Sequence, residues 1–167
     1  MDRTAGANKS VSTDGCVWRR RGTATVELAI ILPVVLFLLF SIIELGLMIK
    51  KRTELGHAAR ESARLAAVGS TPTRMSEGVN SSLTTTRTDG VVRDYQYRRW
   101  DEETGTWGNW TTLGVDGTEN NAAAGDQIRV RIDYDHGLLV PGLMGPVLNA
   151  DDDGNVHLSG AAVMMRE

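Results

Sequence analysis

The sequence has few of the residues on which several classes of protein depend. It contains a single cysteine, Cys16, so no intrachain disulfide can form. None of its three histidines stands in a recognisable metal-binding motif. The sequence also lacks a nucleophile elbow, a phosphate-binding loop and a dinucleotide-binding glycine motif. We therefore predict that the protein is not an enzyme and that it holds neither a metal ion nor another cofactor.

Aromatic residues are also scarce, and neither sign of charge is in large excess. Aromatics make up 5% of the chain, and the formal net charge is −3. Because there is no strong excess of basic residues, nucleic acid is not an expected partner. About a hundred residues follow residue 68, which is enough for one small domain but not for two.

The dominant feature of the sequence is a long apolar run. Residues Leu28 to Ile43 carry no charge, and with its shoulders the run covers residues 26–49. About 24 residues of helix measure about 36 Å, which is enough to cross a hydrocarbon core of about 30 Å with some tilt. Apolar side chains lie on every side of this helix, which is rare in a soluble core helix. We predict one membrane-spanning helix, kinked at Pro33.

Two glutamates flank this run, and a carboxylate inside a bilayer is costly. Glu27 lies where the run begins, and Glu44 lies close to its far end. One interpretation is that both side chains reach toward the lipid headgroups. A second interpretation of Glu27 depends on Gly22. A small residue, a glutamate five positions later and a long apolar helix resemble the pattern that prepilin peptidases cut in type IV pilin-like precursors.

Cleavage after Gly22 would make Thr23 the new N-terminus and Glu27 the fifth residue of the mature chain. A carboxylate in the first turn also interacts favourably with the helix dipole. In a filament, Glu27 would pair with the terminal amine of a neighbouring subunit. Desolvation would largely offset that attraction, so the pair would set the register of the subunits rather than add stability.

The resemblance to a known family rests on four segments: Arg21-Gly-Thr-Ala-Thr-Val-Glu-Leu-Ala, Leu32-Pro33, Ile43-Glu44-Leu-Gly46 and Ala58-Ala-Arg60-Glu-Ser-Ala-Arg64. Together they resemble the TadE-like family, the minor pseudopilins of the tight-adherence (Flp, type IVb) pilus machinery. The resemblance implies a processing site at Gly22, Thr23 and Glu27 and a membrane helix that packs through Leu28, Pro33 and Glu44. The partners it implies are the membrane, a prepilin peptidase, other pilins or pseudopilins and pilus assembly proteins.

Residues 1–22 are predicted to be a disordered basic leader, with five basic and two acidic residues. Their charge favours a cytoplasmic N-terminus, although Lys50-Lys51-Arg52 is basic on the far side. Prepilin cleavage takes place on the cytoplasmic side, so we expect the C-terminal domain outside the cytoplasm. A secretory signal would need a shorter apolar core. A twin-arginine signal would need apolar residues after Arg19-Arg20, and a lipoprotein signal would need Cys16 after the apolar run.

The helix is predicted to continue from residue 23 to residue 68, where Gly69 and Pro72 end it. Its alanine-rich second half would lie on its own domain or pack against neighbouring subunits. Residues 69–167 are predicted to form a small β-rich domain. Its strands are expected at 91–100, 107–115, 126–135 and 156–166, with a loop or short helix at 71–90. The alternation of apolar and charged residues is strictest at 126–135.

Two apolar features of this domain leave alternatives open. The hairpin over 91–115 holds Trp100, Trp107 and Trp110, which would either pack across the strands or form an exposed aromatic surface for a sugar or a pilus partner. The connection over 136–146 would cap the core, which we prefer, or dip into the membrane surface through its apolar side chains: Leu138, Leu139, Leu143 and Met144. Asn149 to Gly154 partly resembles a calcium loop but lacks its final glutamate, so we expect an acidic turn.

The expected fold is therefore α+β: a long N-terminal transmembrane helix that extends into a small antiparallel β-sheet domain. The resemblance implies a pilin-like single-pass membrane protein, processed by a prepilin peptidase, that takes part in assembly of a tight-adherence pilus. The alternative is a membrane-anchored extracytoplasmic binding module that uses the aromatic hairpin.

Overall fold

The structure is a computed structural model, and it describes residues 17–114 and 119–167. The chain divides into two compact units between Ile42 and Ile43. Most of the predicted leader, residues 1–16, lies outside the described residues, and residues 17–22 are helical. The division into a leader, a helix and a β-rich domain at residues 22 and 68 stays a prediction.

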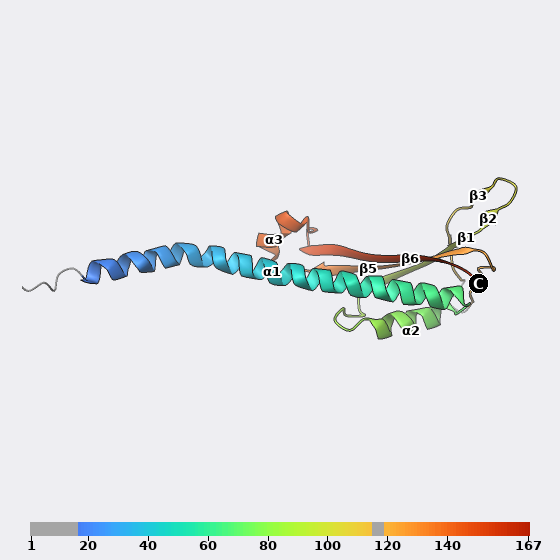
Figure 1. The fold of residues 1–167 in the computed structure, drawn as a ribbon, viewed down its shortest axis with the longest axis horizontal. Helices are drawn as coiled ribbons and strands as arrows, with labels where there is room; N and C mark the ends of the chain where they lie inside the picture. Colours follow the sequence, from blue (N-terminus) through green and yellow to red (C-terminus); the bar gives the residue numbers. More distant parts are fainter. Residues whose placement is uncertain (1–16, 115–118) are drawn as a thin grey trace, which may run out of the picture. The chain divides into compact units, whose positions relative to one another are not determined.

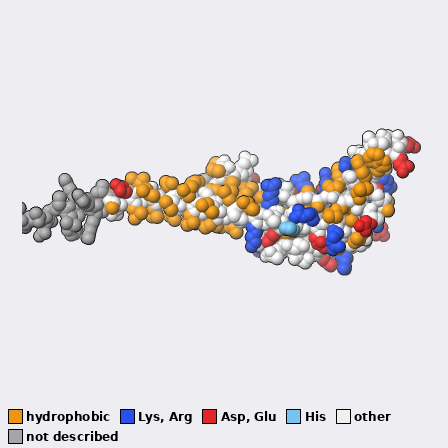
Figure 2. Space-filling model, in the orientation of Figure 1, with side chains coloured by type: hydrophobic (Ala, Val, Ile, Leu, Met, Phe, Trp, Pro, Cys, Tyr) orange, Lys and Arg blue, Asp and Glu red, His pale blue; other side chains and the backbone are white. Residues whose placement is uncertain are grey.

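The first unit is helical. Helix α1 covers Val17–Ala67 without interruption at Pro33, and its part up to Ile42 belongs to this unit. The large apolar side chains between Val26 and Ile42 are mostly exposed, and hydrophobic atoms cover its visible face in Figure 2. Among the described residues, one helical segment, Ala24–Ala67, is long and apolar enough to cross a membrane. Its most apolar stretch has no buried residue, unlike the core helix of a soluble domain.

The second unit is built on a four-stranded antiparallel sheet (Figure 1). Its order is β4 (Thr111–Thr112), β1 (Val91–Arg98), β5 (Gln127–Gly137) and β6 (Asn155–Met165). A separate two-stranded ribbon consists of β2 (Trp100–Asp101) and β3 (Thr106–Trp107). A long apolar helix followed by an antiparallel sheet confirms the predicted α+β class.

One face of the sheet is covered by helices. The second half of α1 and helix α2 (Pro72–Ser82) lie alongside each other (Figure 1). Ile128, Val130 and Ile132 of β5 are fully buried, as their alternation with charged residues predicts. From α1, Leu55 and the small side chains that follow it at helical spacing fill the same core: Ala58, Ala59, Ala63 and Ala66. The alanine-rich half of α1 therefore packs on its own domain.

Helix and sheet approach each other closely at one glycine. Gly160 pairs with Ile132 in the ladder between β5 and β6, and it faces α1. A Cβ atom added at Gly160 would lie 2.5 Å from the backbone carbon of Leu55 and 2.7 Å from the backbone nitrogen of Gly56. Since a Cβ atom does not fit there, glycine is what allows the two backbones to pack directly.

Three segments differ from or refine the sequence-based expectation. The strand expected over 107–115 is split, because its first part pairs with β2 and its second part, β4, pairs with β1. The segment 71–90 contains α2, whose first turn is capped by the Thr71 hydroxyl accepting from the Arg74 amide. The connection after β5 contains helix α3 (Pro141–Leu148), which begins with proline and ends at Asn149 in the left-handed conformation.

Candidate functional site

The predicted processing segment lies in the first part of α1. Gly22 and Thr23 are within the helix, and Glu27 and Leu28 follow on it with exposed side chains. Glu27 is the last charged residue before the uncharged stretch that contains Pro33. Glycine weakens a helix interior by about 1 kcal/mol relative to alanine, so the backbone at Gly22 is easier to open than its surroundings.

Glu44 lies at the other end of the apolar run, in the second unit, and it does not reach outward. Its side chain is 1% exposed. Its Oε1 atom is 2.9 Å from Nε2 of His136, and its Oε2 atom accepts a hydrogen bond of 3.0 Å from the Leu139 amide. The interpretation that Glu44 reaches toward the headgroups is therefore corrected. A carboxylate beside an apolar span is stabilised more by buried donors than by exposure next to acyl chains.

A third side chain completes this polar cluster. Nζ of Lys51, two turns further along α1, is 2.9 Å from Nδ1 of His136 and 5.0 Å from the centre of the Tyr134 ring. An ammonium group can only donate, so Nδ1 accepts and Nε2 carries the proton that it donates to Glu44. The His136 ring thus bridges the Lys51 and Glu44 side chains. No sequence pattern indicates this cluster, because Glu44 and His136 are far apart in the chain.

Glu54 attaches α1 to the segment that follows α2. Its carboxylate accepts hydrogen bonds from the amides of Thr85 and Thr86 and from the hydroxyls of Thr84 and Thr86, at 2.8 to 3.1 Å. Partial burial raises the pKa of Glu54, but these hydrogen bonds outweigh it and lower the pKa to about 2. The contact fixes the loop before β1 on the helix.

The three tryptophans of the predicted hairpin form two groups. Trp100 and Trp107 face each other across β2 and β3 as an edge-to-face pair, with ring centres 5.2 Å apart and planes at 72°. Trp110 lies apart from this pair, under the guanidinium groups of Arg98 and Arg129 at 4.6 and 4.3 Å. Arg98 also lies 5.2 Å from the Trp107 ring, so it links the two groups.

The Trp100–Trp107 pair borders an open groove of about 480 Å³. Its other lining residues include Arg99, Glu102, the loop at 123–126 and Met165. Trp100 is 44% exposed, so part of its ring is available to a ligand. The groove therefore offers an aromatic surface, a cation and a carboxylate side by side.

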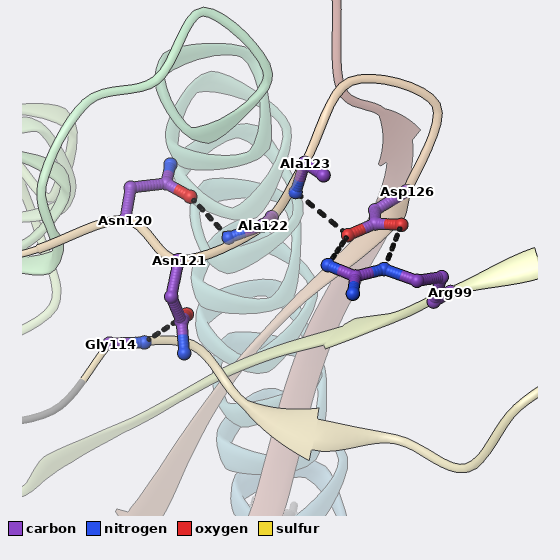
Figure 3. A network of polar contacts seen from close by, with 7 residues as sticks. All are labelled: Arg99, Gly114, Asn120, Asn121, Ala122, Ala123 and Asp126. Carbon is purple, nitrogen blue, oxygen red and sulfur yellow. Dashed lines mark hydrogen bonds and ion pairs between the residues drawn. The ribbon is translucent and has the colours of Figure 1, made fainter.

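A polar network holds the far wall of this groove in place (Figure 3). Asp126 is almost fully buried, and it accepts hydrogen bonds from the Arg99 guanidinium at 3.2 and 3.3 Å and from the Ala123 amide at 2.7 Å. Asn121 accepts a hydrogen bond of 2.8 Å from the Gly114 amide, which ties the same loop to the end of β4. The wall is thus fixed by side chains that the sequence did not single out.

The described residues contain no group of three or more His, Cys, Asp or Glu side chains that could hold a metal ion. In the comparisons with known proteins, the model of one family, described as TadE-like protein, matches residues 22–64. The match confirms the resemblance over the segment that contains Gly22, Glu27, Glu44 and Glu54, and it ends before the sheet. No curated protein and no solved structure matches the chain.

Proposed function

We propose, from the TadE-like character of residues 22–64, that the protein is a pilin-like single-pass membrane protein that takes part in assembling a tight-adherence pilus. A prepilin peptidase would cut it after Gly22. Its partners would be other pilins or pseudopilins and the proteins of the pilus assembly machinery. We propose no catalytic activity for the chain itself.

The observation that carries this proposal is where the family match begins. It starts at Gly22, the residue after which the cut is proposed, and it includes the whole apolar run. A helical glycine is a weak point at which a peptidase can open the backbone. The leader that would be removed holds the only cysteine of the sequence, Cys16.

The apolar part of α1 supports a role in the membrane and in a filament. Apart from Phe37, which is half-buried, the large apolar side chains from Leu28 to Leu39 are exposed to between 41% and 69%. Such a surface is favourable in lipid, and it is equally suited to packing against the helices of neighbouring subunits. Glu27, exposed one turn after the proposed new N-terminus at Thr23, would pair with the terminal amine of a neighbour. This pair would select the register of the subunits.

The proposed orientation has the N-terminus in the cytoplasm and the sheet domain outside it. The basic leader favours this orientation, while Lys50-Lys51-Arg52 opposes it, so charge by itself decides little. The proposed cleavage favours a cytoplasmic N-terminus, because prepilin peptidases cut on the cytoplasmic side of the membrane. Protease digestion of intact spheroplasts, detected through a C-terminal tag, measures the orientation directly.

The test of the processing step is the intact mass and the N-terminal residue of the protein recovered from membranes of its host. We expect a chain that begins at Thr23. Gly22→Lys should leave the leader attached, whereas Gly22→Ala, which keeps a small residue, should be cut. A wild-type chain that still begins at Met1 in cells with an active prepilin peptidase would overturn the processing proposal and leave a plain membrane anchor.

The groove beside Trp100 supports a second candidate, a membrane-anchored module that binds a carbohydrate of the cell envelope. An exposed indole ring next to Arg99 and Glu102 combines a stacking surface with donors and acceptors for hydroxyl groups. Trp100→Ala should abolish binding of the protein to purified envelope polysaccharide and leave the fold intact. Equal binding by wild type and this variant would exclude the groove as the site. Trp110→Ala serves as the control, because Trp110 does not line the groove.

A further inference from the structure

The connection between β5 and β6 presents an apolar surface that the core does not use. Residues 137–150 contain no charged side chain. Leu138 and Met144 point into the domain, with exposures of 8% and 3%, whereas Leu139 and Val147 are 60% and 70% exposed. We call Leu139 and Val147 the α3 surface. Leu138 and Met144 therefore cap the core, whereas Leu139 and Val147 are exposed on the domain surface; the side chain of Leu143 lies outside the described residues.

The α3 surface is fixed to α1 at a defined level. The amide of Leu139 donates to Oε2 of Glu44, and Glu44 is the first charged residue after the uncharged run that ends at Ile43. On α1, Lys50 and Lys51 follow Glu44 by two turns, which is about 10 Å of helix. The α3 surface thus begins where the apolar run ends, on the near side of the first basic residues.

These positions match the dimensions of a bilayer boundary. A hydrocarbon core of about 30 Å within a bilayer of about 40–45 Å leaves a headgroup zone of about 5–7 Å on each side. If the core ends near Glu44, Lys50, about 9 Å further along α1, lies just beyond that zone, from where its long side chain can reach back to lipid phosphates. Leu139, at the level of Glu44, then lies at the boundary between headgroups and acyl chains.

We propose that the α3 surface lies in the membrane interface, with Leu139 and Val147 contacting lipid, so that the sheet domain rests on the bilayer from which α1 emerges. Apolar side chains gain free energy from burial at this depth, as they do in interfacial helices. No Lys or Arg occurs between Arg131 and Arg166, so this connection brings no basic charge into the apolar zone.

The same placement accounts for the buried polar cluster. A carboxylate at the edge of the acyl chains is costly unless donors surround it. Glu44 receives its donors from His136 and from the Leu139 amide at the start of the α3 connection. The connection thus satisfies Glu44 with one face and meets lipid with the other.

The test places a nitroxide label at single positions in the full chain, reconstituted in vesicles of phosphatidylethanolamine and phosphatidylglycerol. In a Cys16→Ser background, cysteine is introduced by Leu139→Cys or Val147→Cys at the α3 surface. Val163→Cys is the matched control, because Val163 is 52% exposed and lies opposite Arg129 on the outer face of the sheet. Leu38→Cys reports the membrane-spanning segment.

The measured quantity is the ratio of collisions with oxygen, which dissolves in lipid, to collisions with a water-soluble nickel complex. We expect labels at positions 139 and 147 to give a high ratio that approaches the ratio at 38, and the label at 163 to give a low one. The inference rests on the proposed membrane anchoring through α1. The label at position 38 tests the anchoring by itself, separately from the contact of the α3 surface with lipid. A high ratio at 38 with ratios at 139 and 147 no higher than at 163 would overturn the inference and keep the anchor. A low ratio at all positions would overturn both.

Discussion

The close approach of α1 to β6 makes a sharp prediction about Gly160. In Gly160→Ala, the added Cβ atom would lie 2.5 Å and 2.6 Å from the backbone carbon and oxygen of Leu55. Because these atoms belong to a helix backbone, they cannot rotate away as the end of a side chain can. Helix and sheet would have to separate by about 1 Å to reach normal contact distance, which loosens the contacts that bury Leu55.

Overpacking of a well-packed core costs about 1–3 kcal/mol, and the backbone origin of this clash puts Gly160→Ala at the upper end. For a domain of this size, about 3 kcal/mol lowers the melting temperature by about 10 °C. Gly56→Ala is the matched control on α1, because the nearest atom to its added Cβ is the end of the Arg60 side chain at 3.8 Å. It should stabilise the helix by about 0.5–1 kcal/mol.

The two substitutions are therefore expected to shift stability in opposite directions. The assay is thermal unfolding of the full chain in mild detergent, followed by near-ultraviolet circular dichroism of the tryptophans in the second unit. An unchanged melting temperature in Gly160→Ala would refute the argued backbone contact. A lower melting temperature in Gly56→Ala would show that the space around Gly56 on α1 is tighter than the structure indicates.

Two further predictions concern the carboxylates of Glu54, which is partly buried, and Glu44, which is buried. Glu54 has a pKa lowered to about 2 from 4.5, so its bonds to residues 84–86 stabilise the fold above pH 4.5 and are lost as the pH falls toward 2. After a discount for solvent screening, these bonds contribute about 1–2 kcal/mol to the free energy of unfolding. The difference in this free energy between wild type and Glu54→Gln should therefore shrink as the pH falls from 4.5 toward 2. A difference that stays constant over this pH range would contradict the prediction. His136→Ala should cost about 3–5 kcal/mol because it removes a donor from buried Glu44, and Glu44→Leu in the same chain should recover much of that loss. The free energies of unfolding are measured by chemical denaturation. If the losses caused by His136→Ala and Glu44→Leu simply add in the double variant, the two side chains are not coupled.

Local patterns in the sequence determined a large part of this protein. The apolar run over residues 26–49 can be recognised without knowing its partners, because its length and composition by themselves suit a membrane span. Strand β5 follows from its alternation, since a period of two sends Ile128, Val130 and Ile132 to one face. The TadE-like resemblance also lies in contiguous residues, and the match over 22–64 confirms it.

Tertiary structure decided the features that depend on residues far apart in the chain. His136, the partner of Glu44, lies in β5, which packs beside α1 only in the folded chain. The residues next to Glu44 in the sequence therefore do not indicate this partner. Trp110 is separated from the Trp100–Trp107 pair because β3 pairs with β2, whereas β4 pairs with β1. The sequence does not show which of the neighbouring strands will pair. Periodicity reports which side of an element is buried, but it does not report what that side meets. Only the folded arrangement of helix and sheet supplies that partner.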